Sequence, residues 1–296
     1  MLEVFIGFTM DNPTMLASGI LGVSGYTMRR VAKSGAGAIV TKSVGIQERE
    51  GNPGPVVLEE EFGLINSIGL SNPGYRKFLD EIRIAREGGK PIVVSLFGSS
   101  PEEFSEMINY LEGEADGFEL NLSCPHVKGL GMEVSSDLEL SEEIMGEARK
   151  NTRKPIFLKL GIKNYLELGK IAEEKKLDGV VAINTLPALR IDLEFKCPSL
   201  GGVRGGLSGP CLKPVALRCV YDLYSELDIK VIGVGGITSG EDALEFIMAG
   251  ASAVQIGTGI LYKGLEIFKE VENYLREYLR KEKCALEDLV GIANVG

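Results

Sequence analysis

The sequence predicts a (β/α)8 barrel, also called a TIM barrel, from three observations. Eight short apolar runs recur along the 296 residues, amphipathic segments separate them, and the runs are continuously hydrophobic rather than alternating. Continuously apolar strands are typical of a parallel sheet covered on both faces, and strands that alternate with helices indicate parallel pairing. Eight such units fit a closed barrel. No linker or shift in composition divides the chain, so we expect one domain over residues 1–296.

The barrel strands can be assigned in order from these apolar runs. We expect them at 14–19, 36–43, 91–98, 117–123, 155–161, 179–185, 230–236 and 253–259. Seven segments between them have helical periodicity, among them 26–35, 100–114 and 140–152, and a further helix should follow the last strand at 264–283. We expect a hairpin before the first strand.

Inserted loops interrupt this regularity after strands 2, 4 and 6. The two longest cover residues 44–76 and 186–210, and a glycine-bearing loop follows the fourth strand. In such barrels the loops that follow the strands build the active site, so these insertions are functional candidates. Lids or interface loops without chemistry are the alternative.

Composition and charge narrow the class of protein. The net charge of −10 argues against a nucleic-acid binder, which normally carries a basic patch. The apolar runs are strand-sized and shorter than a membrane span, and the first residues lack the pattern of a signal peptide. We therefore expect a cytoplasmic protein that binds neither nucleic acid nor membrane.

The cysteines do not form a recognisable metal or disulfide pattern. There are five, at positions 124, 197, 211, 219 and 284, with no CxxC pair and a single histidine in the chain. This is a poor zinc or iron–sulfur pattern, so we expect no metal site in this chain. We expect the last four cysteines to be structural.

Polar residues gather at the predicted carboxyl ends of the strands, where an active site would lie. Lysine in an apolar strand is costly unless it is paired or ligated, so Lys42 and Lys159 suggest a site for electron-rich ligand atoms. Glycine-rich ends at 233–238 and 256–260 suit a phosphate. The other strand-end candidates are Ser18, Asn121, Cys124, Asn184 and Thr185.

Two chemistries fit this set of residues. A Schiff-base aldolase would use one desolvated lysine against a carbonyl substrate, with Lys159 as the candidate. A flavin enzyme would place a lysine at the N1/O2 edge of the isoalloxazine and bind the phosphate of the ribityl tail. The asparagines and Cys124 fit the flavin enzyme better.

Several motifs resemble the class 1 dihydroorotate dehydrogenases. They are "NPTMLASG", "TKSVGIQEREGNPGP", "INSIGLSNPG", "ELNLSCPH", "NTLPALRID", "GGLSGPCLKPVALR" and "VIGVGGITSGEDALEFIMAGASAVQIGT", and they span nearly the whole chain in family order. The resemblance implies an FMN-containing barrel that oxidises dihydroorotate to orotate in pyrimidine biosynthesis. It is strongest to the NAD-linked class 1B, which implies a homodimer and a separate subunit that carries FAD and a [2Fe–2S] cluster.

The resemblance also implies residue roles. Cys124 would be the base that takes the C5 proton while a hydride leaves C6 for flavin N5. Substrate-binding positions would be Lys42, Asn66, Gly69, Leu70, Asn121, Asn184 and Thr185. FMN contacts would come from Ala17, Ser18, Lys42, Ser43, Asn121, Lys159, Ile183, Gly206, Gly235, Gly236, Gly257 and Thr258.

One position departs from the family pattern. The family usually has asparagine where this chain has His126, directly after "CP". Dihydropyrimidine dehydrogenases, which act on uracil or thymine, carry "NLSCPH" as this chain does. "INSIGLSN" and "EREGNPGP" match the dihydroorotate enzymes instead. A dihydropyrimidine dehydrogenase-like enzyme and a non-redox phosphate-binding barrel that uses Lys159 stay as alternatives.

Overall fold

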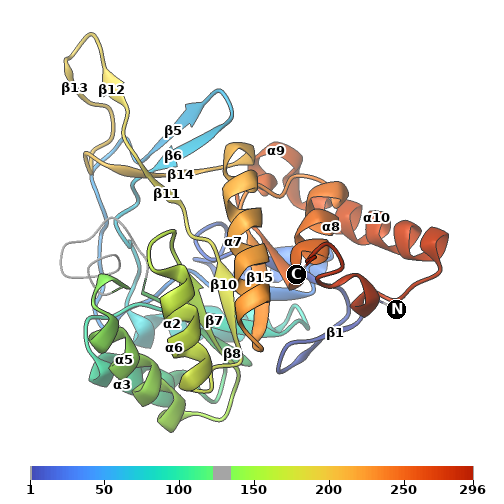
Figure 1. Ribbon diagram of the computed structural model, residues 1–296. Helices are drawn as coiled ribbons and strands as arrows, with labels where there is room; N and C mark the ends of the chain where they lie inside the picture. Colours follow the sequence, from blue (N-terminus) through green and yellow to red (C-terminus); the bar gives the residue numbers. More distant parts are fainter. Residues whose placement is uncertain (1, 123–134, 296) are drawn as a thin grey trace.

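The computed structural model describes residues 2–122 and 135–295, and its centre is a closed barrel of parallel strands (Figure 1). The strands follow one another around the barrel as β3, β4, β7, β8, β9, β10, β15 and β16, and β16 closes on β3. Their bounds are Thr14–Leu16, Ala38–Val40, Ile92–Leu96, Gly117–Asn121, Ile156–Leu160, Gly179–Ala182, Lys230–Val234 and Ala251–Ile256. All eight predicted strands and the predicted fold class are confirmed.

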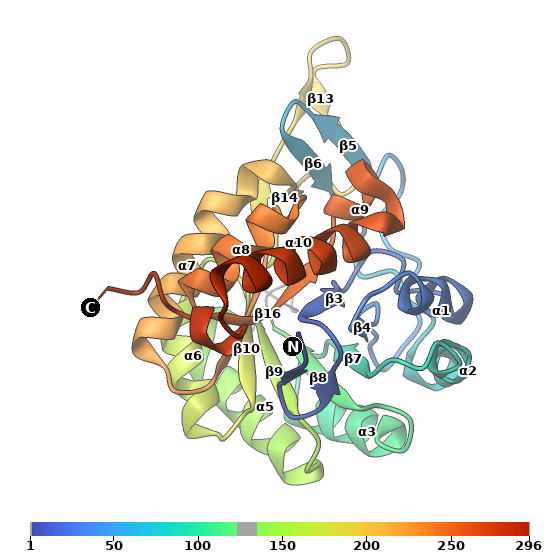
Figure 2. The same ribbon diagram turned by 90° about the vertical axis from the view of Figure 1, so that its right-hand side faces the viewer.

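Each barrel strand leads into a helix, and the helices form the outer layer around the barrel (Figure 2). These are α1 (Gly25–Lys33), α2 (Tyr75–Arg86), α3 (Pro101–Leu111), α5 (Leu138–Asn151), α6 (Tyr165–Glu174), α7 (Lys213–Glu226), α8 (Gly240–Ala249), α9 (Gly259–Lys263) and α10 (Ile267–Glu282). Short 3-10 turns are η1 (Pro210–Leu212), η2 (Gly264–Glu266) and η3 (Glu287–Leu289). None of the helices in the described part of the chain has the length and apolar character needed to cross a bilayer.

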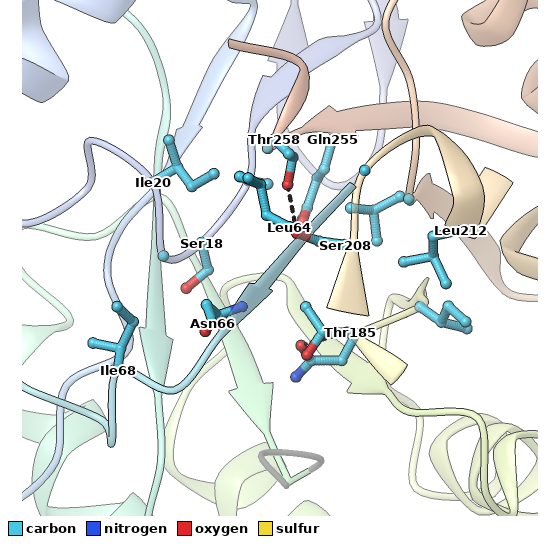
Figure 3. Close-up of a pocket in the computed structure, with 18 of the residues that line it drawn as sticks. Ser18, Ile20, Leu64, Asn66, Ile68, Thr185, Ser208, Leu212, Gln255 and Thr258 are labelled. Atoms are coloured by element: carbon cyan, nitrogen blue, oxygen red, sulfur yellow. Dashed lines mark hydrogen bonds between the residues drawn. The ribbon is translucent and has the colours of Figure 1, made fainter. Parts of the chain in front are cut away.

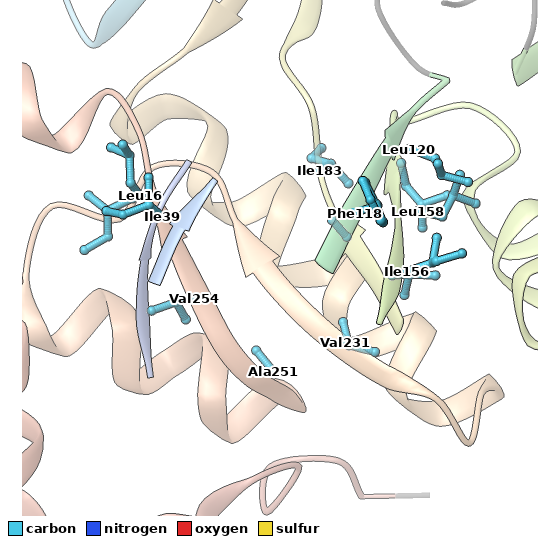
Figure 4. Close-up of a cluster of buried hydrophobic side chains, with 14 of the residues drawn as sticks. Leu16, Ile39, Phe118, Leu120, Ile156, Leu158, Ile183, Val231, Ala251 and Val254 are labelled. Carbon is cyan, nitrogen blue, oxygen red and sulfur yellow. The ribbon is translucent and has the colours of Figure 1, made fainter. Parts of the chain in front are cut away.

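The barrel strands are buried on both faces, which explains their continuous hydrophobicity. Residues such as Leu16, Phe118 and Leu158 point outward and pack under the helices (Figure 4). Inward-facing residues such as Met15, Phe157 and Ile232 form a second apolar cluster. Period-two alternation along each strand sends neighbouring side chains to opposite faces. The inward face therefore also receives the polar residues that the strands carry near their carboxyl ends.

The predicted amino-terminal hairpin is present as β1 (Val4–Phe5) paired with β2 (Thr9–Met10). Ile6 and Met10 join the inner apolar cluster, and the Phe8 ring meets Phe157 edge-on at 6.3 Å. Gly7 lies against Pro155, which precedes β9. The hairpin therefore packs at the amino-terminal end of the barrel, opposite the strand ends where the polar residues gather.

The two longest insertions lie where they were predicted and pair with each other. β5 (Val57–Glu60) and β6 (Gly63–Asn66) follow the second barrel strand, while β11 (Leu186–Ala188) and β14 (Gly205–Ser208) follow the sixth. They form one antiparallel sheet in the order β11-β14-β6-β5. A smaller hairpin, β12 (Ile191–Asp192) with β13 (Cys197–Pro198), projects beyond it (Figure 1). Part of the insertion after the fourth strand, 123–134, lies outside the described residues.

Candidate active site

A cavity of about 250 Å³ opens at the carboxyl ends of the barrel strands, beneath the inserted antiparallel sheet (Figure 3). It gathers side chains from both insertions and from most of the barrel strands. Sixteen of the predicted site residues line it: Ala17, Ser18, Lys42, Ser43, Asn66, Gly69, Leu70, Asn121, Lys159, Ile183, Asn184, Thr185, Gly235, Gly236, Gly257 and Thr258. Residues far apart in sequence therefore form one site, because the carboxyl ends of the barrel strands meet at one end of the barrel.

Gly206, which was also predicted as part of the site, is buried in β14 and is not among the residues that line the cavity. Its carbonyl oxygen accepts a hydrogen bond of 3.2 Å from Asn66 Nδ2. The observed contact of Gly206 with the site therefore runs through the side chain of Asn66, which lines the cavity from β6.

The cavity floor contains a buried polar chain that begins at Lys159. Lys159 Nζ donates to Gln255 Oε1 at 2.9 Å, and Gln255 Nε2 donates to Glu119 Oε2 at 2.8 Å. Lys159, Gln255 and Glu119 are 6%, 1% and 1% exposed. Burial lowers the pKa of Lys159 from its ordinary value, and the negative charge of Glu119 acts in the opposite direction.

Three serines extend this chain to Asn121. Ser95 Oγ donates to the second oxygen of Glu119 at 3.3 Å and lies 2.9 Å from Ser43 Oγ. Asn121 Nδ2 donates to Ser43 Oγ at 3.0 Å, and Ser18 Oγ lies 3.2 Å from the same atom. The bond to Ser43 fixes the rotation of the Asn121 amide at the edge of the cavity.

Glu119, Gln255 and Ser95 are functional candidates that the sequence reasoning missed. Each occupies an inward position within an otherwise apolar run, in "GFELN", "AVQIG" and "PIVVSLFG". A charged residue or an amide at such a position is costly unless it has partners. Strand alternation places Glu119 on the same inward face as Asn121, so the sequence alone could have identified Glu119 as a site candidate.

The glycines of the last two strands form one side of the cavity. Gly235 and Gly236 have positive φ angles of 132° and 77°, which favour glycine over residues with a side chain. A Cβ on Gly236 would lie 2.8 Å from the backbone nitrogen of Lys213, at the start of α7. Thr258 Oγ1 donates to Ser208 Oγ at 2.9 Å, which connects the last strand end to β14 (Figure 3). This backbone can approach a phosphate closely, and α7 begins directly behind it.

The inserted sheet supplies the opposite wall through the segment 66–70. Gly69 and Leu70 both adopt positive φ angles, 79° and 57°. Asn72 holds this turn, because its Nδ2 donates to the Leu70 carbonyl at 2.8 Å while its Oδ1 accepts from the Gly74 amide at 2.9 Å. The turn brings Asn66 and Gly69 into the cavity wall.

Asn184 and Thr185 approach the cavity from the end of β10. The Thr185 amide donates to Asn184 Oδ1 at 2.8 Å. Ile183 precedes them across a cis peptide bond with Ala182. Together with Asn66 and Asn121, Asn184 gives the cavity wall three asparagine carboxamides in addition to Gln255 on the floor, and such groups can read both donors and acceptors on a planar heterocycle.

The predicted base Cys124 and its neighbour His126 lie outside the described residues. The other cysteines can be placed. Cys219 is buried on α7, where burial raises the pKa of its thiol to about 11, as suits a packing residue. Cys284 is partly buried against the core, whereas Cys197 and Cys211 are exposed. The structural role expected of these cysteines stays a prediction.

Comparison with known proteins gives one consistent result. The family model described as dihydroorotate dehydrogenase matches residues 1–279. A protein of Methanocella arvoryzae named dihydroorotate dehydrogenase B (NAD(+)), catalytic subunit, is 46% identical over 97% of this chain and 96% of its own length. A protein of Pyrococcus furiosus with the same name is 46% identical over 99% and 98%.

A solved structure shares the fold. The DHODH of Eimeria tenella, solved in complex with ferulenol, superposes with a TM-score of 0.87 and covers all of this chain and 89% of its own. The sequence identity is 23%, so this likeness is evidence of the shared barrel architecture alone.

Proposed function

The chain belongs to the dihydroorotate dehydrogenase family, and from this premise we propose that it oxidises dihydroorotate to orotate with a bound FMN. The family implies a flavin cofactor, and the name of the relatives implies a catalytic subunit that works with a separate partner. The observation that supports the proposal best is the cavity itself. It combines two lysines, three asparagines and a glycine rim at the carboxyl end of a barrel.

The residues present fit a flavin mononucleotide. Gly235, Gly236 and Gly257 line the cavity with backbone, which a phosphate can approach closely. A Cβ on Gly236 would lie 2.8 Å from the Lys213 backbone nitrogen, so a side chain there would displace this rim or the start of α7. The Lys159 ammonium offers positive charge in a buried position. An ammonium has three N–H donors and Gln255 takes one, so Lys159 has further donors to offer the N1/O2 edge of the flavin. The flavin would supply the hydride acceptor, its N5 atom.

The remaining wall would bind the substrate. We propose that Asn66, Asn121 and Asn184 read the amide edges of the pyrimidine ring, helped by Gly69, Leu70 and Thr185. Lys42 would supply positive charge to the carboxylate of an anionic substrate, which offsets the net charge of −10 on the chain. Cys124 remains the proposed base for the C5 proton, since a thiol with a pKa of roughly 8.5 is close to neutral pH.

The non-redox alternative also has an observation in its favour. Burial lowers the pKa of Lys159, as a Schiff-base lysine requires. However, the Lys159 ammonium is bonded to Gln255 and lies in the field of Glu119, both of which favour its charged form. A nucleophilic amine must be neutral, so this arrangement supports a flavin-binding role for Lys159 instead.

The proposed assembly is a homodimer with a partner subunit that carries FAD and a [2Fe–2S] cluster. Support for the homodimer comes from apolar side chains that the insertions expose, among them Phe62, Leu193 and Phe195. Contiguous exposed apolar patches mark protein–protein interfaces. Light scattering of the purified chain tests the dimer, and Phe195→Ser should shift it toward the monomer.

A pair of variants tests the proposed division of the cavity. Asn66→Ala should retain FMN but weaken orotate binding by about tenfold or more, because a hydrogen-bonding amide is lost from the cavity wall. Lys159→Met should weaken FMN binding itself. Both are measured by titration of the flavin absorbance, with exposed Asn109→Ala as the control. Unchanged orotate binding in Asn66→Ala would contradict the assignment of this wall.

A further inference from the structure

We propose that Glu119 is a positioning residue that acts on Lys159 through Gln255. In this proposal Glu119 holds the Lys159 ammonium group in its charged form at the cavity floor and so raises the reduction potential of the flavin bound there. The inference rests on the flavin-binding function proposed above, but the charge on Lys159 can be tested without flavin.

The three side chains lie in a geometry that couples them. They come from three different strands, β8, β9 and β16, and all point into the barrel. The Gln255 amide is bonded at both ends, accepting from Lys159 at 2.9 Å and donating to Glu119 at 2.8 Å. A flip of this amide would place its NH2 against an ammonium and its oxygen against a carboxylate. The two charged partners therefore fix its orientation.

The hydrogen bonds of the serine chain run in one direction, toward Glu119. The Glu119 carboxylate can only accept, so Ser95 donates to it, and Ser43 must then donate to Ser95. Ser43 in turn accepts from Asn121. Every donor in this chain is thus oriented toward Glu119. Both carboxylate oxygens are satisfied without solvent, which compensates the burial of a charge that is 1% exposed.

Lys159 needs a countercharge to stay protonated in its buried position. Burial lowers the pKa of Lys159, and the Coulombic attraction of Glu119 opposes this. A lysine that is 6% exposed and lacks a countercharge tends to lose its proton, because an ammonium is expensive to keep out of water. Glu119 supplies the countercharge without a direct contact, since the Gln255 amide stands between the two groups.

The charge on Lys159 affects the reduction potential of a flavin bound next to it. Reduction places negative charge at the N1/O2 edge, so a positive charge nearby favours the reduced form. Removing Glu119 has two opposite effects on the potential. Losing its negative charge raises the potential, whereas losing the proton from Lys159 lowers it. Lys159 is the member of the pair that offers its ammonium to the cofactor, so deprotonation should outweigh the loss of the carboxylate.

The direct test follows Lys159 in the flavin-free protein. Lysine labelled with 13C at Cε is titrated by NMR, and Lys159→Met identifies the resonance. We expect Lys159 to be protonated at pH 7 in the natural sequence. In Glu119→Gln, which keeps the shape of the side chain, its acid dissociation constant should rise at least tenfold. Glu277→Gln, on the exposed side of α10, removes the same charge and should leave Lys159 unchanged. An unchanged Lys159 in Glu119→Gln overturns the proposal.

The reduction potential of the FMN-loaded chain then tests the consequence. In Glu119→Gln the equilibrium constant for two-electron reduction should fall at least tenfold, which is about 30 mV. A potential that stays the same or rises would mean that Lys159 keeps its charge without Glu119, and the proposal would be wrong. If Glu119→Gln does not fold, Gln255→Met interrupts the same chain and should move both quantities in the same directions.

A chain that binds no FMN would refute the proposed function, and the NMR titration would still decide the charge on Lys159. A chain that binds FMN with a potential insensitive to Glu119 would refute only the present inference. The two failures are therefore distinguishable.

Discussion

Replacing Gln255 with methionine should destabilise the fold measurably, although the two side chains have similar volumes. The amide makes two hydrogen bonds to charged partners, at 2.9 and 2.8 Å. A hydrogen bond to a charged group contributes about 1.5–3 kcal/mol. Glu119 is 1% exposed, so its lost bond is not recovered from solvent. Lys159 lines the cavity, so water can replace part of its lost bond to Gln255. The free energy of unfolding should therefore fall by about 2–4 kcal/mol in total.

Equilibrium denaturation in urea measures this loss, with Gln47→Met as the matched control. Gln47 is exposed, and its substitution should change the free energy of unfolding by less than about 0.5 kcal/mol. A loss below about 1 kcal/mol in Gln255→Met would refute the reasoning, because it would mean that the buried chain contributes little and that Glu119 and Lys159 do not depend on Gln255.

Three further predictions concern other parts of the molecule. Burial raises the pKa of Asp242, but hydrogen bonds from Lys213 and Thr238 outweigh it and hold the pKa below its usual value. Asp242→Asn should therefore lower the free energy of unfolding by about 1 kcal/mol at pH 7. This difference from the natural protein should vanish as the pH falls below about 4 and Asp242 is protonated, as urea denaturation at a series of pH values would show. A difference that persisted at low pH would contradict this ion pair as its cause. Gly236→Ala should weaken FMN binding at least tenfold in a fluorescence titration, because its Cβ would lie 2.8 Å from a backbone nitrogen. Gly89→Ala is the control: Gly89 has a similar φ of 72° but open space around it, so this variant should bind FMN normally. Equal affinities would refute the glycine rim. Cys124→Ala should retain flavin but slow its reduction by dihydroorotate about 10²–10⁴-fold in stopped flow, and a normal rate would refute the base assignment.

The barrel could be predicted because its signal is repeated. Each strand, such as 155–161 or 230–236, is continuously apolar, and each is followed by an amphipathic segment. Strand ends were less accurate, and residues such as Thr41 and Lys42 lie just beyond β4. The polar residues 41–43 follow the apolar run, and Thr41 N–H still donates to Val93 O at 3.0 Å, so neither composition nor pairing changes sharply where the strand stops.

The pairing of the two insertions could not be predicted. Residues 64–66 and 206–208 are separated by about half the chain, and short strands of this kind carry little periodicity. Their pairing depends on the barrel, which brings the ends of the second and sixth strands to the same side. Asn66 could be named as a site residue from the family resemblance, but its bond to Gly206 is visible only in the folded chain.

The buried chain on the cavity floor was missed for a related reason. Lys159 was recognised because a lysine in an apolar strand is conspicuous, yet Glu119 and Gln255 are in the same situation. Glu119 and Gln255 lie 136 residues apart in the sequence, and they meet only because the barrel closes. The sequence indicates that buried polar residues such as Glu119 need partners. Only the folded barrel shows which residues those partners are.

Anaerobic flavin reduction tests the central claim most directly. The purified chain is loaded with FMN, its visible spectrum is recorded, and dihydroorotate and dihydrouracil are added in separate experiments. We predict that dihydroorotate bleaches the flavin and that dihydrouracil does not. Bleaching by dihydrouracil alone would contradict the proposed substrate and favour the dihydropyrimidine alternative suggested by His126, and a protein that binds no flavin would contradict the account as a whole.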